Sequence, residues 1–336
     1  MISFVWTEKD PMFSGRGGSE NCTVGHIREL TEMGIDARVV TVGRGKKFHS
    51  NFFPDIQFED VASLAEVAEL DDTVVFINLP HPIDTKNPSF CFFHCPPQKD
   101  ISLRAEYKAA MVGKTPIVAS KFMQSTWTKY LGLPDNGIPI VFPFADPAFA
   151  NVVRPLPTSD KTSVLFAGRL MPEKGVYLYL EAIHHTALKQ GFTFSITNAG
   201  NQTEDGAIIE AFLKHHPQVN LLEARHTPTE VAGLLAQYQI LVMPSTKFYW
   251  HEGFGMLSVE AQHAGCQVIG SDHAGLPETD CGGLTLFESG NSFALAETIR
   301  EVAQGKPVTA EQRKERCKFF TRRQSVERLL EVLDYE

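Results

Sequence analysis

Short apolar runs alternate along this chain with amphipathic segments of helical length. The runs are rich in β-branched and aromatic residues and occupy 2–6, 37–42, 73–78, 90–94, 116–120, 163–168, 192–200, 219–223, 239–245 and 266–272. Alternation of this kind predicts parallel strands joined by crossover helices. The pattern therefore places the chain in the α/β class, with doubly wound, Rossmann-like sheets.

The segments between these runs carry helical patterns. One spans 20–33 and stops at Gly34, as a helix with a glycine C-cap does. The others lie at 175–190, 204–216, 228–237 and 291–304, and a last one at 309–333 is predicted to break near Phe320.

A proline-rich stretch separates two halves of this pattern. Six prolines within 134–158 exclude a long helix there. We place a linker at 146–160, between a first domain at 1–145 and a second at 161–319, which suits a chain of 336 residues. Doubly wound sheets bind ligands at the carboxyl ends of their strands, so two such domains are expected to face each other across a cleft.

Composition limits which partners and which cellular compartment are expected for this chain. The net charge of −9 argues against nonspecific binding to nucleic acid. Six scattered cysteines in a chain of this length indicate reduced thiols and a cytoplasmic protein. No membrane-spanning segment is expected, because no apolar run approaches the length needed to cross a bilayer. A signal peptide is not expected either, because MISFVW is followed at once by charged residues.

The segment HEGFGMLSVEAQHAG, 251–265, carries Glu252 and Glu260 within an otherwise apolar or small run. It follows a predicted strand, and the N-terminus of its predicted helix would present free N–H groups and a positive dipole to an anion such as phosphate. Carboxylates accept hydrogen bonds from vicinal hydroxyls of a ribose or sugar ring. The alternative is structural, with Glu252 capping the helix and Glu260 solvated.

Two other strand ends carry similar signals. VLFAGRLMPEKG, 164–175, places Arg169 and Lys174 where they could grip a diphosphate, although ordinary surface charge is the alternative. SDHAGLPE, 271–278, contains Gly275, which would allow backbone N–H groups to approach an anion, or would form a plain turn.

These three segments, in this order and spacing, resemble the retaining GT-B-fold glycosyltransferases of glycosyltransferase family 4. The resemblance covers the second domain and extends more weakly into the first, through SGRGGSE (14–20), FFHCPP (92–97) and FADPAF (144–149). It implies a GT-B architecture of two Rossmann-like domains and transfer of a sugar from a nucleotide-sugar donor.

The resemblance also implies roles for single residues. In the second domain Arg169 and Lys174 would hold the donor's diphosphate, Glu260 would bind the ribose hydroxyls, and Glu252 would face the sugar hydroxyls. The distal phosphate and sugar would lie against the backbone of Gly253, Phe254 and Gly255.

In the first domain, the resemblance implies that Gly17 and Gly18 approach the phosphate and that His94 sits over the donor sugar near the anomeric centre. A C-terminal segment at 320–336 would carry a helix that crosses back to the first domain. Acceptors would bind on the side of the first domain.

The expected reaction is transfer of a hexose, UDP-sugars being favoured as donors, to a hydroxyl of a glycan, lipid or small molecule, with retention of configuration. Arg169 and Lys174 could stabilise the leaving diphosphate, so neither a metal nor another cofactor is expected. The alternatives are a sugar-nucleotide epimerase or phosphorylase of the same architecture and a non-catalytic nucleotide-sugar-binding protein. The oligomeric state is left open.

Two further features have simple alternatives. Cys91, His94 and Cys95 have the residue types of a metal site, but on one strand they would point to both faces, which favours a buried strand ending in an active-site histidine. The basic helix predicted at 100–111 could rest on anionic lipid at the inner membrane face, although a solvated helix face is the favoured explanation.

Overall fold

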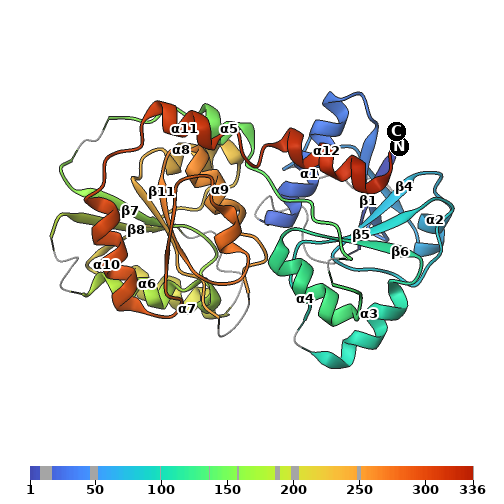
Figure 1. Ribbon diagram of the computed structural model, residues 1–336, viewed down its shortest axis with the longest axis horizontal. Coiled ribbons are helices and arrows are strands. Elements are labelled where there is room, and N and C mark those ends of the chain that lie inside the picture. Colours follow the sequence, from blue (N-terminus) through green and yellow to red (C-terminus); the bar gives the residue numbers. More distant parts are fainter. Residues whose placement is uncertain are drawn as a thin grey trace. The chain divides into compact units, whose positions relative to one another are not determined.

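The computed structural model describes residues 1–7, 17–45, 52–98, 100–135, 137–156, 159–185, 190–197, 204–247 and 251–335. The chain divides into two compact units (Figure 1). The first consists of Met1–Phe144 together with Arg322–Glu336, and the second of Ala145–Thr321.

Within the described residues, the first unit holds a six-stranded parallel sheet in the order β3-β2-β1-β4-β5-β6. Its strands are β1 (Ile2–Trp6), β2 (Ala37–Val42), β3 (Phe58–Val61), β4 (Thr73–Ile77), β5 (Ser89–Phe93) and β6 (Lys114–Val118). The five strands expected in this half are confirmed. The sequence did not predict β3, because its FEDV segment is polar and half-exposed, as suits an edge strand.

Helices cover both faces of this sheet, as doubly wound topology requires. They are α1 (Gly18–Glu32), α2 (Leu64–Ala68), α3 (Arg104–Ala110), α4 (Lys121–Leu131) and α12 (Arg322–Leu333), with a 3₁₀ turn η1 (Ile101–Leu103). Val67 of α2 and Trp127 of α4 belong to the core on one face. On the other face α1 places His26 against Phe4 and Phe92.

Helix α12 packs on α1 within this unit, although the two lie at opposite ends of the sequence (Figure 1). Arg322 donates to Glu29 at 2.9 Å and to Glu32 at 2.7 Å, and His26 contacts Ser325 at 2.8 Å. The break predicted near Phe320 is confirmed, because Phe320 has φ +53° and separates α12 from α11 (Ala310–Arg316).

Among its described residues, the second unit also holds a six-stranded parallel sheet, in the order β12-β11-β10-β7-β8-β9. The strands are β7 (Thr162–Phe166), β8 (Phe192–Thr197), β9 (Val219–Leu222), β10 (Ile240–Met243), β11 (Gln267–Ser271) and β12 (Leu284–Phe287). All five predicted strands are present. The sequence missed β12, whose LTLF segment is short and partly exposed.

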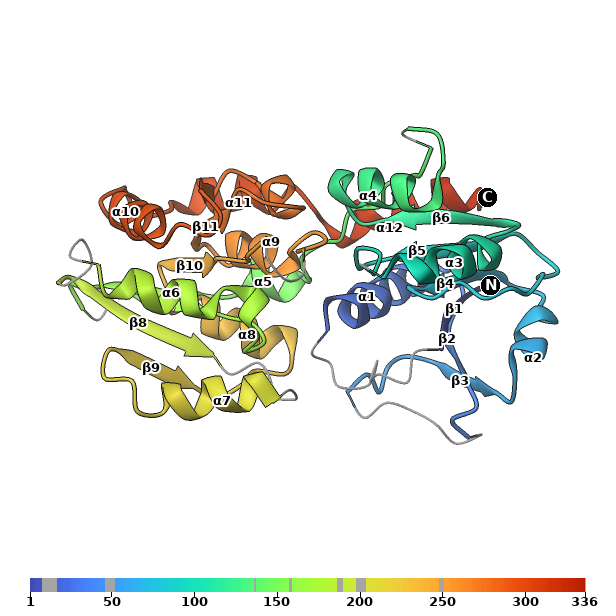
Figure 2. The ribbon, with the colours of Figure 1, turned by 90° about the horizontal axis from the view of Figure 1, so that it is seen from below.

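Two sets of helices flank this second sheet (Figure 2). The set that completes the main core consists of α6 (Val176–Ile183), α7 (Glu204–Leu213) and α10 (Ser292–Ala303). The other set consists of α5 (Pro147–Asn151), α8 (Pro228–Leu235), α9 (Met256–His263) and α11. In its described residues the proline-rich stretch contains one helix, the five-residue α5, which is capped by Asp146 accepting from the Ala148 N–H.

Three arginines hold the C-terminal end of α9. Arg313 donates to the His263 carbonyl at 2.7 Å, Arg154 to the Ala264 carbonyl at 2.9 Å, and Arg316 to the Cys266 carbonyl at 2.9 Å. Cations at a helix C-terminus stabilise its dipole and satisfy carbonyls that lack helical partners. The orientation of α9 is therefore fixed from its far end.

Gly175 joins the loop after β7 to α6, and a substitution there would test how tightly this unit is packed. Its φ is +78°, and a Cβ there would lie 1.8 Å from the Pro244 carbonyl oxygen. Gly191 is a matched control, because its φ is +82° and a Cβ there would meet none of the described residues within 4 Å. We expect Gly191→Ala to cost about 1 kcal/mol of unfolding free energy from backbone strain alone. Gly175→Ala should cost at least ~3 kcal/mol.

Urea unfolding of the two variants beside the wild-type chain measures both numbers. Equal losses for the two substitutions would show that the loop carrying Lys174 yields easily and that the Pro244 contact does not constrain it.

Candidate functional site

The candidate site of the second unit is built around an ion pair between two loops. Lys174 ends the 3₁₀ turn η2 (Pro172–Lys174) after β7, and Glu252 lies in the loop after β10, the neighbouring strand. The Lys174 Nζ donates to Glu252 Oε2 at 2.6 Å, and the Ser245 hydroxyl donates to the same oxygen at 3.4 Å. The Thr246 N–H also donates to the Glu173 carbonyl at 2.9 Å. The two loops therefore form one connected structure at the carboxyl ends of β7 and β10.

The Glu252 carboxyl is held in its charged form. Burial by itself would raise its pKa, but the charge and hydrogen bond of Lys174, the charge of Arg169 and the Ser245 hydroxyl bring the pKa below its usual value. Arg169 is exposed, and in the described part of the chain its guanidinium has no hydrogen-bond partner. The site thus combines an ionised carboxylate with a cation whose donors are available to an anion.

The Gly-Phe-Gly segment between Glu252 and α9 is tightly packed. The Phe254 ring is 4% exposed and lies edge-on to Phe320, with ring centroids 5.5 Å apart. The Gly275 N–H itself donates to the Glu252 carbonyl at 3.0 Å, and the approach of neighbouring backbone N–H groups to an anion stays a prediction. A Cβ on Gly275 would lie 2.1 Å from the Gly253 oxygen, so this glycine is needed for the approach of the Glu252 loop. Trp250, the other aromatic neighbour of Glu252, lies outside the described residues.

Glu260 has an environment opposite to that of Glu252. It lies inside α9, and burial followed by the charge of Asp146 raises its pKa to about 8. The alternative in which Glu252 caps the helix is wrong, because the N-cap is Gly255, at φ +99°, and no side chain caps it. A carboxyl with this pKa is mostly protonated at pH 7 and can donate as well as accept a hydrogen bond.

The sequence-predicted residues of the first unit lie at the carboxyl end of its sheet. His94 directly follows β5, and its N–H donates to the Asn78 side-chain oxygen at 2.8 Å. The His94 ring stacks on Phe92 at 4.2 Å, and burial lowers its pKa to about 3, which keeps the imidazole neutral. Gly17 is the N-cap of α1, with its N–H donating to Glu20 at 3.0 Å, and Gly18 is the first helical residue. The preceding part of the predicted glycine loop, 14–16, lies outside the described residues.

Several polar side chains near the Glu252 loop were not predicted from sequence. The hydroxyls of Thr246 and Ser271 are buried and have no hydrogen-bond partner among the described residues. His251 and His273 share a hydrogen bond, with Nδ1 and Nε2 2.7 Å apart. Ser271 ends β11, and the other three lie in the loops that follow β10 and β11. Their position at the carboxyl ends of strands was the signal, because residues there are candidate ligand contacts.

Within the described ranges, no group of three or more His, Cys, Asp or Glu side chains is placed to hold a metal ion. Cys91 is buried and Cys95 is exposed, so the cluster considered around His94 does not converge. All six cysteines are free thiols.

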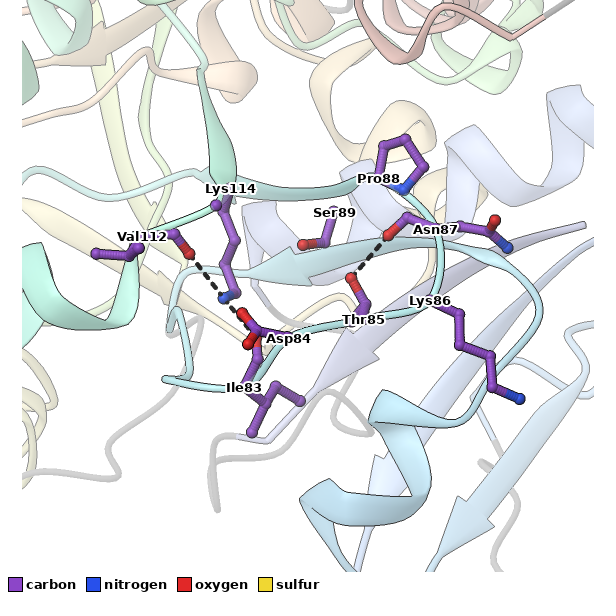
Figure 3. A pocket seen from close by; sticks show the side chains of 10 residues that line it. Ile83, Asp84, Thr85, Lys86, Asn87, Pro88, Ser89, Val112 and Lys114 are labelled. Carbon is purple, nitrogen blue, oxygen red and sulfur yellow. Dashed lines mark hydrogen bonds between the residues drawn. The ribbon is translucent and has the colours of Figure 1, made fainter.

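A small polar pocket of about 280 Å³ lies elsewhere in the first unit (Figure 3). Its walls are the segments 83–89 and 112–114, so it lies at the amino ends of β5 and β6. The Lys114 Nζ donates to the carbonyl of another pocket residue, Ile83, at 2.8 Å. The pocket contains none of the predicted site residues and lies at the sheet edge opposite His94.

The basic segment at 100–111 forms η1 and α3. Arg104 donates to the carbonyls of Lys129 and Tyr130 at the end of α4. Its guanidinium therefore forms hydrogen bonds within the first unit. None of the helices described here combines the length and the apolar character that crossing a membrane requires.

Comparison with known sequences finds similarity within the second unit. Residues 161–304 match the family described as "Glycosyl transferases group 1". An uncharacterised 41.2 kDa protein of the Klebsiella pneumoniae cps region is 30% identical over 162 residues, which are 48% of this chain and 41% of that protein. Glycogen synthase of Mycobacterium tuberculosis is 29% identical over 160 residues, 47% of this chain and 37% of that protein. Each match thus spans less than half of the relative.

Comparison with solved structures covers both units. A glycosyltransferase of Rickettsia africae has a TM-score of 0.75 at 16% identity, covering 99% of this chain and 97% of that one. HepE of Anabaena, solved with UDP and glucose, has a TM-score of 0.71 at 16% identity, covering 100% of this chain and 99% of that one. These likenesses and the two six-stranded parallel sheets confirm the predicted GT-B fold class.

The raised pKa of Glu260 makes stability depend on pH in a predictable direction. Between its unfolded value of 4.5 and its folded value of about 8, the folded chain holds a proton that the unfolded chain has lost. Rising pH therefore lowers the unfolding free energy across this window, by at most about 1.4 kcal/mol per pH unit from this group. Glu260→Gln should remove this contribution.

Urea unfolding at pH 5.5 and 7.5 measures the effect as the difference between the wild-type chain and Glu260→Gln. A difference that stays the same at the two pH values would show that the pKa of Glu260 is not raised in the fold.

Proposed function

We propose that this chain is a glycosyltransferase that moves a hexose from a nucleotide-diphosphate sugar to a hydroxyl acceptor. The observation that carries the proposal is the Lys174–Glu252 pair, with the unengaged Arg169 beside it at the carboxyl end of the second sheet. The match of 161–304 to the glycosyl transferases of group 1 supports the same activity. HepE, of similar fold, was solved with UDP and glucose, which supports a UDP-sugar as donor.

Each residue around the pair has a role that its environment suits. Arg169 would bind the diphosphate through its free guanidinium, and Lys174 would join it, because an ammonium has three donors and Glu252 takes only one. Glu252, kept ionised, would accept hydrogen bonds from hydroxyls of the sugar. The N-terminus of α9 would add its partial positive charge on the phosphate side. Glu260, further along α9, would bind the ribose hydroxyls.

The chemistry follows from where charge develops. As the bond between the anomeric carbon and the phosphate oxygen breaks, its electron pair goes to the leaving diphosphate. Fixed cations lower the energy of that transition state without a metal ion. We propose that the acceptor hydroxyl attacks from the same face and gives its proton to the leaving phosphate oxygen, which retains the configuration. His94, neutral because it is buried, would contact the donor sugar near the reacting carbon.

Removing the charges of this site should abolish transfer without unfolding the chain. We expect Arg169→Ala and Glu252→Gln each to lower kcat/KM by a factor on the order of 10² to 10³. Lys318→Met is the control, because it breaks an exposed pair of the same 2.6 Å length, between Lys318 just after α11 and Glu315 within it. Initial rates with a nucleotide-sugar and an acceptor, and melting temperatures of all variants, measure the effect. Unchanged rates in both site variants would refute the assignment.

The donor class can be tested before the acceptor is known. A ligand that binds only the folded chain raises its melting temperature by mass action. We expect UDP-sugars to raise it more than GDP- or ADP-sugars, and the shift to survive EDTA. NMR of the product should show the anomeric configuration of the donor.

Three results would contradict parts of this proposal. An epimerase would convert the donor without acceptor, and a binding protein would show the thermal shift without turnover. Loss of both shift and turnover in EDTA would require a metal.

A further inference from the structure

Asn78 has an unusual backbone conformation at the end of β4. Its φ is +61°, in the left-handed region that residues other than glycine rarely adopt. Its N–H donates to the Phe92 carbonyl at 2.9 Å, and the next N–H, of Leu79, donates back to the Ile77 carbonyl at 2.7 Å. The chain thus turns sharply at Asn78 while the residue remains attached to β5.

This turn removes a hydrogen-bond acceptor from the sheet. In β4 and β5, Ile77 lies opposite Phe92, so Asn78 would lie opposite Phe93. In a regular parallel ladder, a residue that donates to the residue before its partner also accepts from the residue after it. The Asn78 carbonyl would therefore accept the His94 N–H. The side-chain oxygen of Asn78 accepts that N–H instead, at 2.8 Å.

This side-chain hydrogen bond holds His94, the residue that directly follows β5. Its backbone is held as if the sheet continued for one more residue. Its ring then rests on Phe92, and its Nε2 is buried without a hydrogen-bond partner among the described residues. Buried polar atoms are normally satisfied, so an unpaired ring nitrogen at a strand end is suited to meet a ligand.

We infer that Asn78 is a positioning residue for His94: its amide oxygen replaces the lost strand carbonyl and fixes where the imidazole sits. The inference rests on the proposed function, in which His94 contacts the donor sugar. A left-handed asparagine at this place serves two needs, because its backbone turns the chain away while its side chain completes the ladder. Sterically strained conformations of this kind are retained where the surrounding structure specifies them.

The test compares three substitutions at Asn78. Asn78→Asp keeps an oxygen acceptor and tolerates the left-handed region, whereas Asn78→Gly keeps only the backbone freedom. Asn78→Ser shortens the acceptor and gives a second test if the glycine variant does not fold. We expect the glycine and serine variants to lose kcat about tenfold to a hundredfold, as misplacement of a reacting group does. The aspartate variant should stay within a few-fold of wild type.

The donor KM should change less than twofold in these variants, because the proposed diphosphate and ribose contacts belong to the second unit. Asn291→Gly is the matched control: Asn291 Oδ1 accepts the Ala294 N–H at 2.9 Å in the second unit. A loss of kcat equal to that of this control, or a rise in KM matching the fall in kcat, would overturn the inference.

NMR of the His94 backbone amide and imidazole separates this inference from the proposed function. Asn78→Gly should shift both sets of signals, whereas Asn78→Asp and Asn291→Gly should leave the imidazole signals in place. Unmoved His94 signals in Asn78→Gly would overturn the positioning role even if the enzyme transfers sugar. A wild-type chain that transfers no sugar would refute the proposed function, while shifted signals would still support the positioning role.

Discussion

The contact between Lys174 and Glu252 is the interaction on which the second unit's site depends. A partly buried ion pair is stable only while both partners are present, because loss of either leaves an uncompensated charge. Here the pair also determines geometry, since its two residues come from the loops after two adjacent strands, β7 and β10. Gly175 keeps the first loop close to the Pro244 carbonyl, and Gly275, after β11, lets its segment approach the backbone of the second loop at Gly253. The charges of the site are thus held in place by the backbone before any ligand binds.

Helix α9 connects this pair to the rest of the unit. Arg313 and Arg154 donate to the carbonyls of His263 and Ala264 at its C-terminus, while among the described residues no side chain caps its N-terminus at Gly255. The positive end of the helix is therefore left for whatever lies beside Glu252. Glu260, on the same helix, has its pKa raised, whereas that of Glu252 is lowered. Environments that push the pKa values of two carboxyl groups apart give them different chemical tasks. In the proposed reaction these tasks are contact with the sugar and with the ribose.

The sequence predicts the sheets well and the pairing of site residues poorly. Strands such as 2–6 and 239–245 are mostly apolar, so local composition identifies them, whereas the polar edge strand β3 has the composition of a loop. The residue types of the site were also visible, because Arg169 and Glu252 follow strand ends. Their environments were not, since these arise from contacts distant in sequence. Lys174 meets Glu252 across 78 positions, and the pKa of Glu260 depends on Asp146 in another helix cap. The requirement for Gly275 comes from the Gly253 carbonyl, which no local pattern shows.

Two residues with left-handed backbone conformations lie at the carboxyl ends of the sheets, where the predicted site residues also lie. Asn78 at φ +61° follows β4, and Ala274 at φ +57° follows β11, both at carboxyl ends of strands. Each is next to a hydrogen bond that fixes a predicted site residue: the Asn78 side chain holds the His94 N–H, and the neighbour of Ala274, Gly275, donates to the Glu252 carbonyl. Left-handed non-glycine residues cost of order 1 kcal/mol or more, so the surrounding structure must compensate for them. Of the four such residues described, Phe320 and Asp334 flank α12, whereas Asn78 and Ala274 lie where the backbone of a predicted site residue is held.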